Sequence, residues 1–177
     1  AAGRIQVCSS RTGAVLREWV GDAPGILLGS VLAEVGALDG DGWPEIAAGV
    51  PAANGPAGSN AGAVWILDLR SGAVRAVLDG AVGGGRFGAA IAGAGDVDQD
   101  GARDLVIGSP GVPAGGRVDL RYGPDFLASD RFAGPVSGSG FGSAVAILPD
   151  RNGDGSWDLL VGAPIEQLGQ GRAYSYE

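Results

Sequence analysis

Three stretches of this chain align with one another over 24 residues without a gap, at 28–51, 87–110 and 141–164. They read LGSVLAEVGALDGDGWPEIAAGVP, FGAAIAGAGDVDQDGARDLVIGSP and FGSAVAILPDRNGDGSWDLLVGAP. The second residue of each stretch, Gly29, Gly88 or Gly142, sets a spacing of 59 and then 54 residues. An internal period of this length means that each repeat is one supersecondary unit, which buries its apolar face only against its neighbours. The chain is therefore expected to fold as a tandem array of similar units.

A second repeated unit follows each stretch and is typical of the start of a β-hairpin. Its copies are Gly3–Cys8, Gly62–Leu67, Gly116–Arg121 and Gly171–Tyr176. The first two copies continue through 9–21 and 68–80, where a Thr-Gly or a Ser-Gly pair falls between two apolar runs. Such pairs indicate a tight hairpin turn, because glycine adopts the backbone angles that the turn needs.

Each period is predicted to hold four short strands. The first strand alternates small residues, as in Gly88–Ala94 and Gly142–Ile147. The second is a brief apolar run suited to burial on both faces, as in Leu105–Ile107 and Leu159–Val161. The third and fourth strands form the hairpin, and no helical periodicity of useful length is present. Four antiparallel strands per ~40–60 residues indicate a β-propeller blade, so the predicted fold is all-β; the alternative is a stack of β-sandwich or solenoid repeats.

The whole of 1–177 is expected to be a single propeller region of about three blades. It divides into the third and fourth strands of a blade at 1–28, blades at 29–87 and 88–141, and the first three strands of a blade at 142–177. Propellers ordinarily have four to eight blades. We therefore expect the chain to be part of a longer propeller or one arc of an assembly, completed by further blades from the same protein or from other copies.

The amino-acid composition excludes several classes of protein and partner. Glycine makes up 35 of the 177 residues without a three-residue period, which fits many tight turns and excludes collagen. The net charge is −8 and every basic residue is arginine, which argues against nucleic acid and membrane insertion. The single cysteine, Cys8, excludes an internal disulfide, and its alignment with Leu67, Arg121 and Tyr176 indicates an unreactive strand thiol. With no signal peptide and no initiator Met, we expect a mature or excised product.

Acidic residues recur at fixed offsets between the first and second strands of each repeat. In the second repeat, loop positions 1, 3, 5 and 9 are Asp96, Asp98, Asp100 and Asp104. Alternate residues of a tight loop point the same way, so these side chains are expected to converge on one ion. Calcium takes about six to eight oxygen ligands, including backbone carbonyls such as that of Ala102 at position 7. The loop at 96–104 therefore predicts a calcium site.

The third repeat has the same pattern. Its predicted ligands are Asp150, Asn152, Asp154, Ser156 and Asp158, with Ser156 contributing its carbonyl. Asp-Gly pairs alone would be explained by hairpin turns. They do not explain acids at fixed offsets, because clustered carboxylates repel one another unless a cation neutralises them.

The first repeat has a weaker version of the loop. Ala37 stands at position 1 in place of an acid, and Glu45 replaces aspartate at position 9. The remaining candidates are Asp39, Asp41 and the carbonyl of Trp43. Since fewer carboxylates bind calcium more weakly, we expect affinity to fall from 96–104 to 150–158 to 37–45.

These motifs together resemble the FG-GAP repeats of integrin α-subunit propellers, and the resemblance covers nearly the whole chain. The Phe-Gly and Gly-Ala-Pro signatures are Phe141-Gly142 with Gly162-Ala163-Pro164, and the variants Phe87-Gly88 with Gly108-Ser109-Pro110 and Leu28-Gly29 with Gly49-Val50-Pro51. The resemblance implies a calcium-stabilised propeller, extracellular or at the cell surface, that binds proteins or glycans in adhesion. It also implies that the ions are structural and that ligands meet the loops on the opposite face.

The sequence favours a binding module over an enzyme. It has no His or Lys for acid–base or Schiff-base chemistry, and Cys8 has no His partner. The candidate ligand loops are Gly21–Leu28, Pro51–Ala61, Gly80–Arg86 and Gly134–Gly140. Trp43 and Trp157 lie in the metal loops and are expected to pack against a neighbouring blade rather than to contact a ligand.

Two other functions stay open. The first is a purely structural spacer within a large surface protein. The second is a redox propeller, because the hairpins at 9–19 and 68–78 faintly resemble repeats of quinoproteins, which bind a quinone on the propeller axis. Those repeats lack the carboxylate loop found in this chain.

Overall fold

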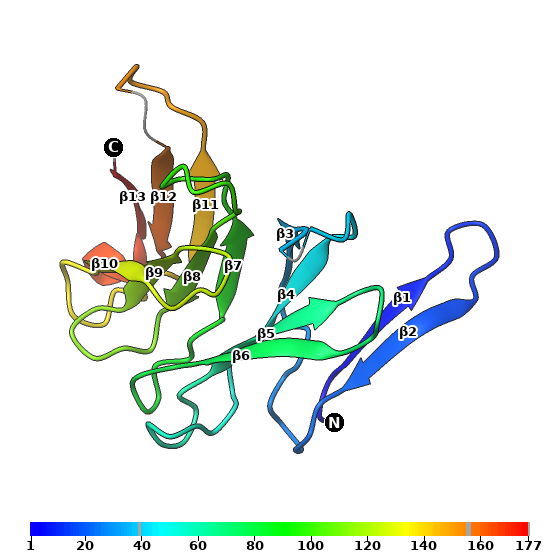
Figure 1. Ribbon diagram of the computed structural model, residues 1–177. Helices are drawn as coiled ribbons and strands as arrows, with labels where there is room; N and C mark the ends of the chain where they lie inside the picture. Colours follow the sequence, from blue (N-terminus) through cyan, green and yellow to red (C-terminus); the bar gives the residue numbers. More distant parts are fainter. Residues whose placement is uncertain (39, 155–156, 177) are drawn as a thin grey trace.

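A computed structural model describes residues 1–38, 40–154 and 157–176 of the chain. The regular secondary structure of this part of the chain is almost entirely β, with thirteen strands in four antiparallel sheets that we number in chain order. Figure 1 shows the four sheets following one another around an open arc. The prediction of an all-β chain built from four-stranded antiparallel blades is confirmed.

Each sheet is a meander in which strands adjacent in sequence pair with one another. The first sheet pairs β1 (Arg4–Cys8) with β2 (Val15–Val20). The second contains β3 (Leu32–Gly36), β4 (Glu45–Val50), β5 (Ala63–Asp68) and β6 (Val74–Asp79). The third contains β7 (Ala90–Gly93), β8 (Leu105–Ser109), β9 (Arg117–Arg121) and β10 (Ser129–Ala133). The fourth contains β11 (Ala144–Leu148), β12 (Asp158–Ala163) and β13 (Arg172–Tyr176).

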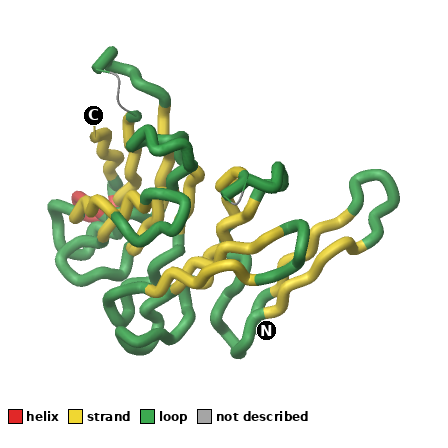
Figure 2. The backbone as a smooth tube through the Cα atoms, in the orientation of Figure 1, coloured by secondary structure: helices red, strands yellow, loops and turns green. Residues whose placement is uncertain are grey.

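A helical turn interrupts this pattern in the fourth sheet. The short helix α1 (Glu166–Gly169), red in Figure 2, lies between β12 and β13, where the sequence contains no helical periodicity. Its first residue, Glu166, is buried and accepts a hydrogen bond from the hydroxyl of Tyr174. Arg172 lies 3.4 Å from the same carboxylate, so the turn is held by β13 rather than by its own propensity.

The meander places the loops at two opposite ends of the sheets. The carboxylate loops join the first and second strands, so they share one end with the turns of the outer hairpins. The connections between the second and third strands, and between one sheet and the next, lie at the other end. We refer to these as the carboxylate end and the opposite end.

The apolar core lies between sheets. Because side chains alternate along a strand, Val64 and Ile66 of β5 face the third sheet, while Ala63 and Leu67 pack toward the first. The middle strand β8 is buried along its whole length, as its continuous apolar run predicts. Three apolar clusters among the described residues, one at each junction, hold the arc together.

The Phe-Gly and Gly-Ala-Pro signatures meet at each junction. Phe87 is only 1% exposed and forms an isolated bridge with Gly62 of the preceding sheet. The N–H of Gly88, which has a φ of +83°, donates to the carbonyl of Gly108 at 3.1 Å. A Cβ atom on Gly108 would lie 2.0 Å from the carbonyl oxygen of Gly142 in the next sheet. The repeated glycines therefore allow close main-chain contact both within a blade and between blades.

Candidate metal centre

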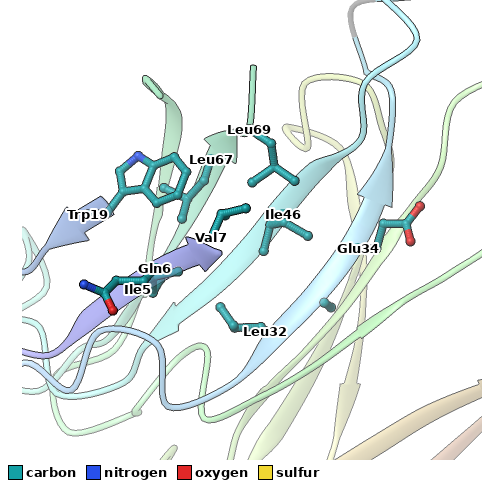
Figure 3. A pocket seen from close by; sticks show the side chains of 10 residues that line it. Ile5, Gln6, Val7, Trp19, Leu32, Glu34, Ile46, Leu67 and Leu69 are labelled. Atoms are coloured by element: carbon teal, nitrogen blue, oxygen red, sulfur yellow. The ribbon is translucent and has the colours of Figure 1, made fainter. Parts of the chain in front are cut away.

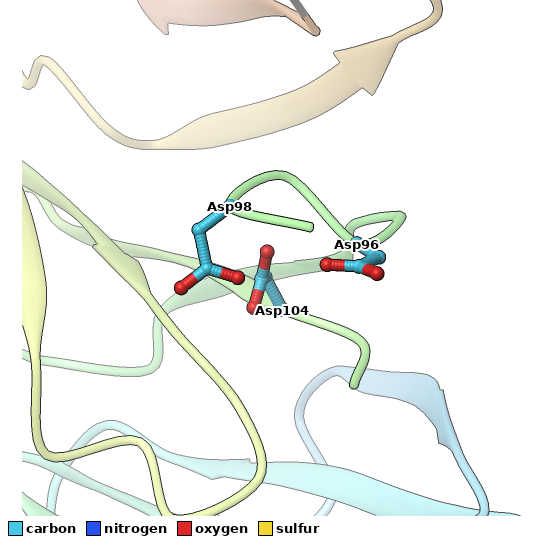
Figure 4. A group of neighbouring side chains, drawn as sticks. All are labelled: Asp96, Asp98 and Asp104. Carbon is cyan, nitrogen blue, oxygen red and sulfur yellow. The ribbon is translucent and has the colours of Figure 1, made fainter. Parts of the chain in front are cut away.

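The loop between β7 and β8 brings three acidic side chains together. One carboxylate oxygen from each of Asp96, Asp98 and Asp104 lies within 4.8 Å of the others. Figure 4 shows the three carboxylates turned toward a common space. Asp104, at the entry to β8, is fully buried, whereas Asp96 is half-buried and Asp98 is exposed. The group is thus anchored on the sheet at one side and open to solvent at the other.

Hydrogen bonds to backbone amides shape this loop. Asp96 accepts the N–H of Asp100 at 3.0 Å and the N–H of Gly101 at 2.9 Å. Asp100 in turn accepts the N–H of Ala102 at 2.8 Å. Gly101 has a φ of +93°, which explains why glycine stands at loop position 6.

One contact recurs in all three carboxylate loops. The acid at position 9 accepts the backbone N–H of position 2, which closes the loop. The donor and acceptor pairs are Leu38 to Glu45 at 2.6 Å, Val97 to Asp104 at 2.6 Å and Arg151 to Asp158 at 2.8 Å. The acid at position 9 therefore fixes the loop in addition to any role as a ligand.

The electrostatics of the second loop favour a cation. Burial raises the pKa of Asp104, and the charges of Asp98 and Asp100 raise it further, against the lowering effect of hydrogen bonds from Gly123 and Val97. No arginine forms an ion pair with these acids in the described part of the chain. The donor set consists of oxygen alone, which suits a hard divalent cation such as Ca²⁺. The residues present therefore fit the metal.

Not every predicted ligand joins the group. Asp100 lies outside the set of three acids. The predicted ligand of Ala102 is its backbone carbonyl, which stays a prediction. In the third loop Asp150 accepts the N–H of Gly153 at 2.6 Å. The described residues of that loop form no cluster of three acids, and Ser156 lies outside the described residues.

The third loop nevertheless keeps its carboxylates and amide in place. Asn152 accepts the N–H of Asp154 at 2.9 Å and donates its own amide to the Asp154 carboxylate at 3.0 Å. Asp158 is buried, and its Oδ1 atom has no hydrogen-bond partner among the described residues. The corresponding oxygen of Asp104 accepts a hydrogen bond from the backbone N–H of Gly123 at 2.9 Å.

The first loop contains arginine partners that no sequence pattern indicates. Arg70 lies 3.2 Å from Asp41, and Arg75 lies 3.8 Å from the buried Glu45. Both arginines come from the β5–β6 hairpin, so no spacing within the loop points to them. Asp39 lies outside the described residues.

The two loop tryptophans differ in their surroundings. The ring of Trp157 lies against Gly95 of the preceding blade, as expected, whereas Trp43 is 55% exposed. The N–H of Trp43 donates to Asp41 at 2.7 Å, and its side chain lines a shallow surface with Leu16 and Arg70. The expected packing of tryptophan on a neighbouring blade therefore holds for Trp157, whereas Trp43 borders Leu16 of the first sheet and keeps more than half of its surface exposed.

A second hollow lies at the opposite end, between the first two sheets. This groove of about 520 Å³ is bounded by the predicted ligand loops 21–28 and 51–61. Its polar and aromatic lining includes Asp22, Asn54, Asn60, Trp65 and Asp79. Within the described residues, the carboxylates of Asp22 and Asp79 make no hydrogen bond or ion pair.

Among all the residues that the structure describes, no helix is long and apolar enough to cross a membrane.

Known proteins share these features over most of the chain. The FG-GAP repeat family matches residues 35–67. Integrin alpha-3 of Cricetulus griseus is 38% identical over 131 residues, which cover 67% of this chain and 12% of that protein. Integrin alpha-2 of Bos taurus is 30% identical over 165 residues, covering 84% of this chain and 14% of the relative. Phosphatidylinositol-glycan-specific phospholipase D of Rattus norvegicus is 44% identical over 101 residues, which cover 46% of this chain and 12% of that protein.

The chain thus spans only 12–14% of the length of these relatives. The repeat spacing, the four-stranded sheets and the family match together show that the chain consists of FG-GAP repeats folded as integrin-like β-propeller blades.

Proposed function

We propose that this chain is a calcium-stabilised, non-catalytic binding module of an extracellular or cell-surface protein. The observation that carries the calcium proposal is the convergence of Asp96, Asp98 and Asp104, which have no arginine partner within the described residues. Bound calcium would neutralise these carboxylates and tie the β7–β8 loop to the edge of the sheet. The third loop would hold a second ion through Asp150, Asn152, Asp154, Asp158 and the carbonyl of Ser156.

A structural role for the ion fits the chemistry of the loops. A catalytic metal needs an open position beside an acid or a base, and the chain has neither His nor Lys. Weak extracellular modules bind calcium at about 10⁻⁴–10⁻³ M, which is the range expected for a solvent-exposed loop. The name of one relative denotes a phospholipase, but the matched segment is only 12% of that protein.

The groove at the opposite end is the proposed place for a protein or glycan ligand. The Trp65 ring would pack against a flat apolar surface, while Asp22 and Asp79 would accept hydrogen bonds from hydroxyl or amide groups. Two relatives are integrins by name, which supports a role in adhesion. We also propose that 1–177 forms one propeller region, with blades at 29–87 and 88–141 and partial blades at 1–28 and 142–177.

Thermal melting with and without calcium tests the proposal. Calcium at about ten times its Kd, a few millimolar, stabilises the folded state by ~1.4 kcal/mol, so it is expected to raise the Tm by about 3–6 °C. Asp98→Ala should remove one binding event in calorimetry and the part of this shift that the second loop contributes. Glu18→Gln, which neutralises an exposed carboxylate on β2, should leave both unchanged. A Tm that does not respond to millimolar calcium or to chelator contradicts the proposal.

Partner binding separates a recognition module from a purely structural spacer. A glycan array or a pull-down from surface proteins should give a signal that Asp79→Ala reduces and Glu18→Gln does not. Binding that is unaffected by Asp79→Ala would place the contact elsewhere. No binding in either assay would favour the spacer.

A further inference from the structure

One aromatic side chain reaches from the fourth sheet to the carboxylate loop of the third. Trp157 directly precedes Asp158, the acid at position 9 of the third loop. A Cβ atom on Gly95 would lie 2.2 Å from Cζ2 of Trp157, so the indole lies directly against the main chain of Gly95. Gly95 in turn directly precedes Asp96, the first acid of the second loop. A single side chain therefore joins the two loops.

The same contact occurs one blade earlier. Arg103 occupies the loop position of Trp157, and its Cδ would lie 2.9 Å from a Cβ atom on Gly36. Gly36 occupies the position of Gly95 in the preceding repeat. In both repeats, the residue that precedes the acid at position 9 therefore packs against a glycine of the preceding repeat. That glycine is the residue just before the carboxylate loop. This recurrence makes the contact a property of the repeat rather than an accident of one tryptophan.

The indole borders a hollow beside the second loop. It lines this hollow of about 580 Å³ together with Asp96, Ala102, Arg103 and Ile147. Trp157 is 37% exposed, so the surrounding residues cover only part of its side chain. Because Trp157 directly precedes Asp158, the position of the indole depends on how firmly Asp158 is held.

From this geometry we propose that Trp157 couples calcium binding at the third loop to calcium binding at the second. The inference rests on the proposed calcium sites. An ion held by Asp158 and its neighbours would fix the backbone that carries Trp157, and the indole would then restrict Gly95 and Asp96. Ordering of Gly95 is part of the entropy cost of closing the second loop around an ion, so ions at the two loops favour each other.

The coupling must be reciprocal, because it is a free energy shared by two binding equilibria. Such couplings typically change affinity about fivefold or more. Trp157 acts here as a positioning residue, since it contacts the loop and not the ion. A merely structural tryptophan would lower stability without linking the two affinities.

A double-mutant cycle tests the coupling. Calorimetry on the full chain would measure the calcium affinity of the second loop, identified as the event lost in Asp98→Ala. Four proteins are compared: the unmodified chain, Trp157→Ala, Asp154→Ala and the double variant. Asp154→Ala removes a carboxylate that the third loop needs in order to bind calcium. We expect each single variant to weaken the second loop about fivefold to tenfold, and the double variant to weaken it no further.

Two further variants serve as controls. Trp157→Phe keeps a ring on Gly95 and should restore most of the affinity, while circular dichroism confirms that Trp157→Ala is folded. Trp43→Ala removes a tryptophan from the first loop and should leave the second loop unchanged. Effects that multiply in the double variant, or single variants within twofold of the unmodified protein, overturn the coupling but leave the calcium proposal standing. If adding calcium to the unmodified protein produces no heat of binding, both the coupling and the calcium proposal are contradicted.

Discussion

At the scale of single residues, the first carboxylate loop differs from the second in how its charge is neutralised. The Asp41 carboxylate already has the guanidinium of Arg70 at 3.2 Å, and Glu45 has Arg75 at 3.8 Å. The Arg70 side chain is 61% exposed, so its ion pair contributes little to the free energy of unfolding. It does occupy a carboxylate that a metal would need. An arginine therefore competes with calcium at the loop that has the fewest acids.

Removal of this competitor is expected to strengthen the weakest site. Arg70→Gln should raise the calcium affinity of the loop at 37–45 about twofold to fivefold, the range expected for loss of an exposed ion pair. Calorimetry in a background with Asp98→Ala and Asp154→Ala would isolate this loop. Arg11→Gln, at the tip of the β1–β2 hairpin, is the matched control. An affinity that is unchanged or lower in Arg70→Gln would rule out competition.

The order of the three loops is testable with the same method. Asp100→Ala should cost more total calcium affinity than Asp41→Ala, because the second loop has four acids, whereas the first has three, of which Asp41 and Glu45 have arginine partners. An equal or larger loss from Asp41→Ala contradicts the order.

The acids of the candidate site could be predicted because their spacing is local. Alternation within one loop places Asp96 and Asp98 on the same side, and the start of the next strand supplies Asp104. Arg70, Arg75 and the packing of Trp157 could not be predicted in the same way. They come from a neighbouring hairpin or a neighbouring blade, and the repeat spacing contains no information on which side chains meet across that distance.

At the scale of strands and sheets, the glycines of the signatures determine how closely two blades approach. Gly108 lies in β8, and a Cβ atom there would lie 2.0 Å from the Gly142 carbonyl oxygen of the next sheet. The equivalent residue of the fourth sheet is Gly162, where the nearest atom to an added methyl group is the Cβ of Ala144 at 3.3 Å. The same motif position is therefore packed in one sheet and comparatively open in another.

This pair provides a matched test of the junction between blades. Gly108→Ala should lower the free energy of unfolding by about 1–3 kcal/mol, the usual cost of overpacking, because the next blade must move away. Gly162→Ala should cost much less, since its neighbour is a methyl group that needs to shift only slightly. Chemical denaturation of both variants measures the difference. Equal losses would mean that the motif glycine serves its own strand and not the junction.

Strand order and pairing could be predicted from sequence because each blade is a meander of local hairpins. The helical turn α1 could not, because Glu166 is held there by Arg172 and Tyr174 of the following strand. The relative tilt of successive sheets likewise depends on contacts such as that of Gly108 with Gly142.

At the scale of the whole molecule, the two ends of the arc expose apolar faces whose counterparts elsewhere are buried. Leu32 of β3 is 50% exposed, whereas Ile91, at the same position of the next blade, is 8% exposed. Leu32 lines the groove of about 440 Å³ shown in Figure 3, together with Ile5, Val7 and Ile46. At the other end, Leu160 of β12 is 38% exposed, whereas its counterpart Val106 is fully buried.

These two faces are complementary, because each junction inside the chain already joins a face of one kind to a face of the other. We therefore expect the chain, expressed alone, to associate head to tail, with the fourth sheet of one copy against the part of the second sheet, around Leu32, that the two-stranded first sheet of another copy leaves exposed. Leu160→Glu should abolish this association, since it would bury an unpaired charge in the interface. Leu127→Glu, at an exposed site on the β9–β10 connection, should leave association unchanged. Light scattering distinguishes the outcomes: the expected mass is a multiple of 17.4 kDa that falls to 17.4 kDa in Leu160→Glu. A well-folded unmodified chain that stays at 17.4 kDa at high concentration would contradict this association.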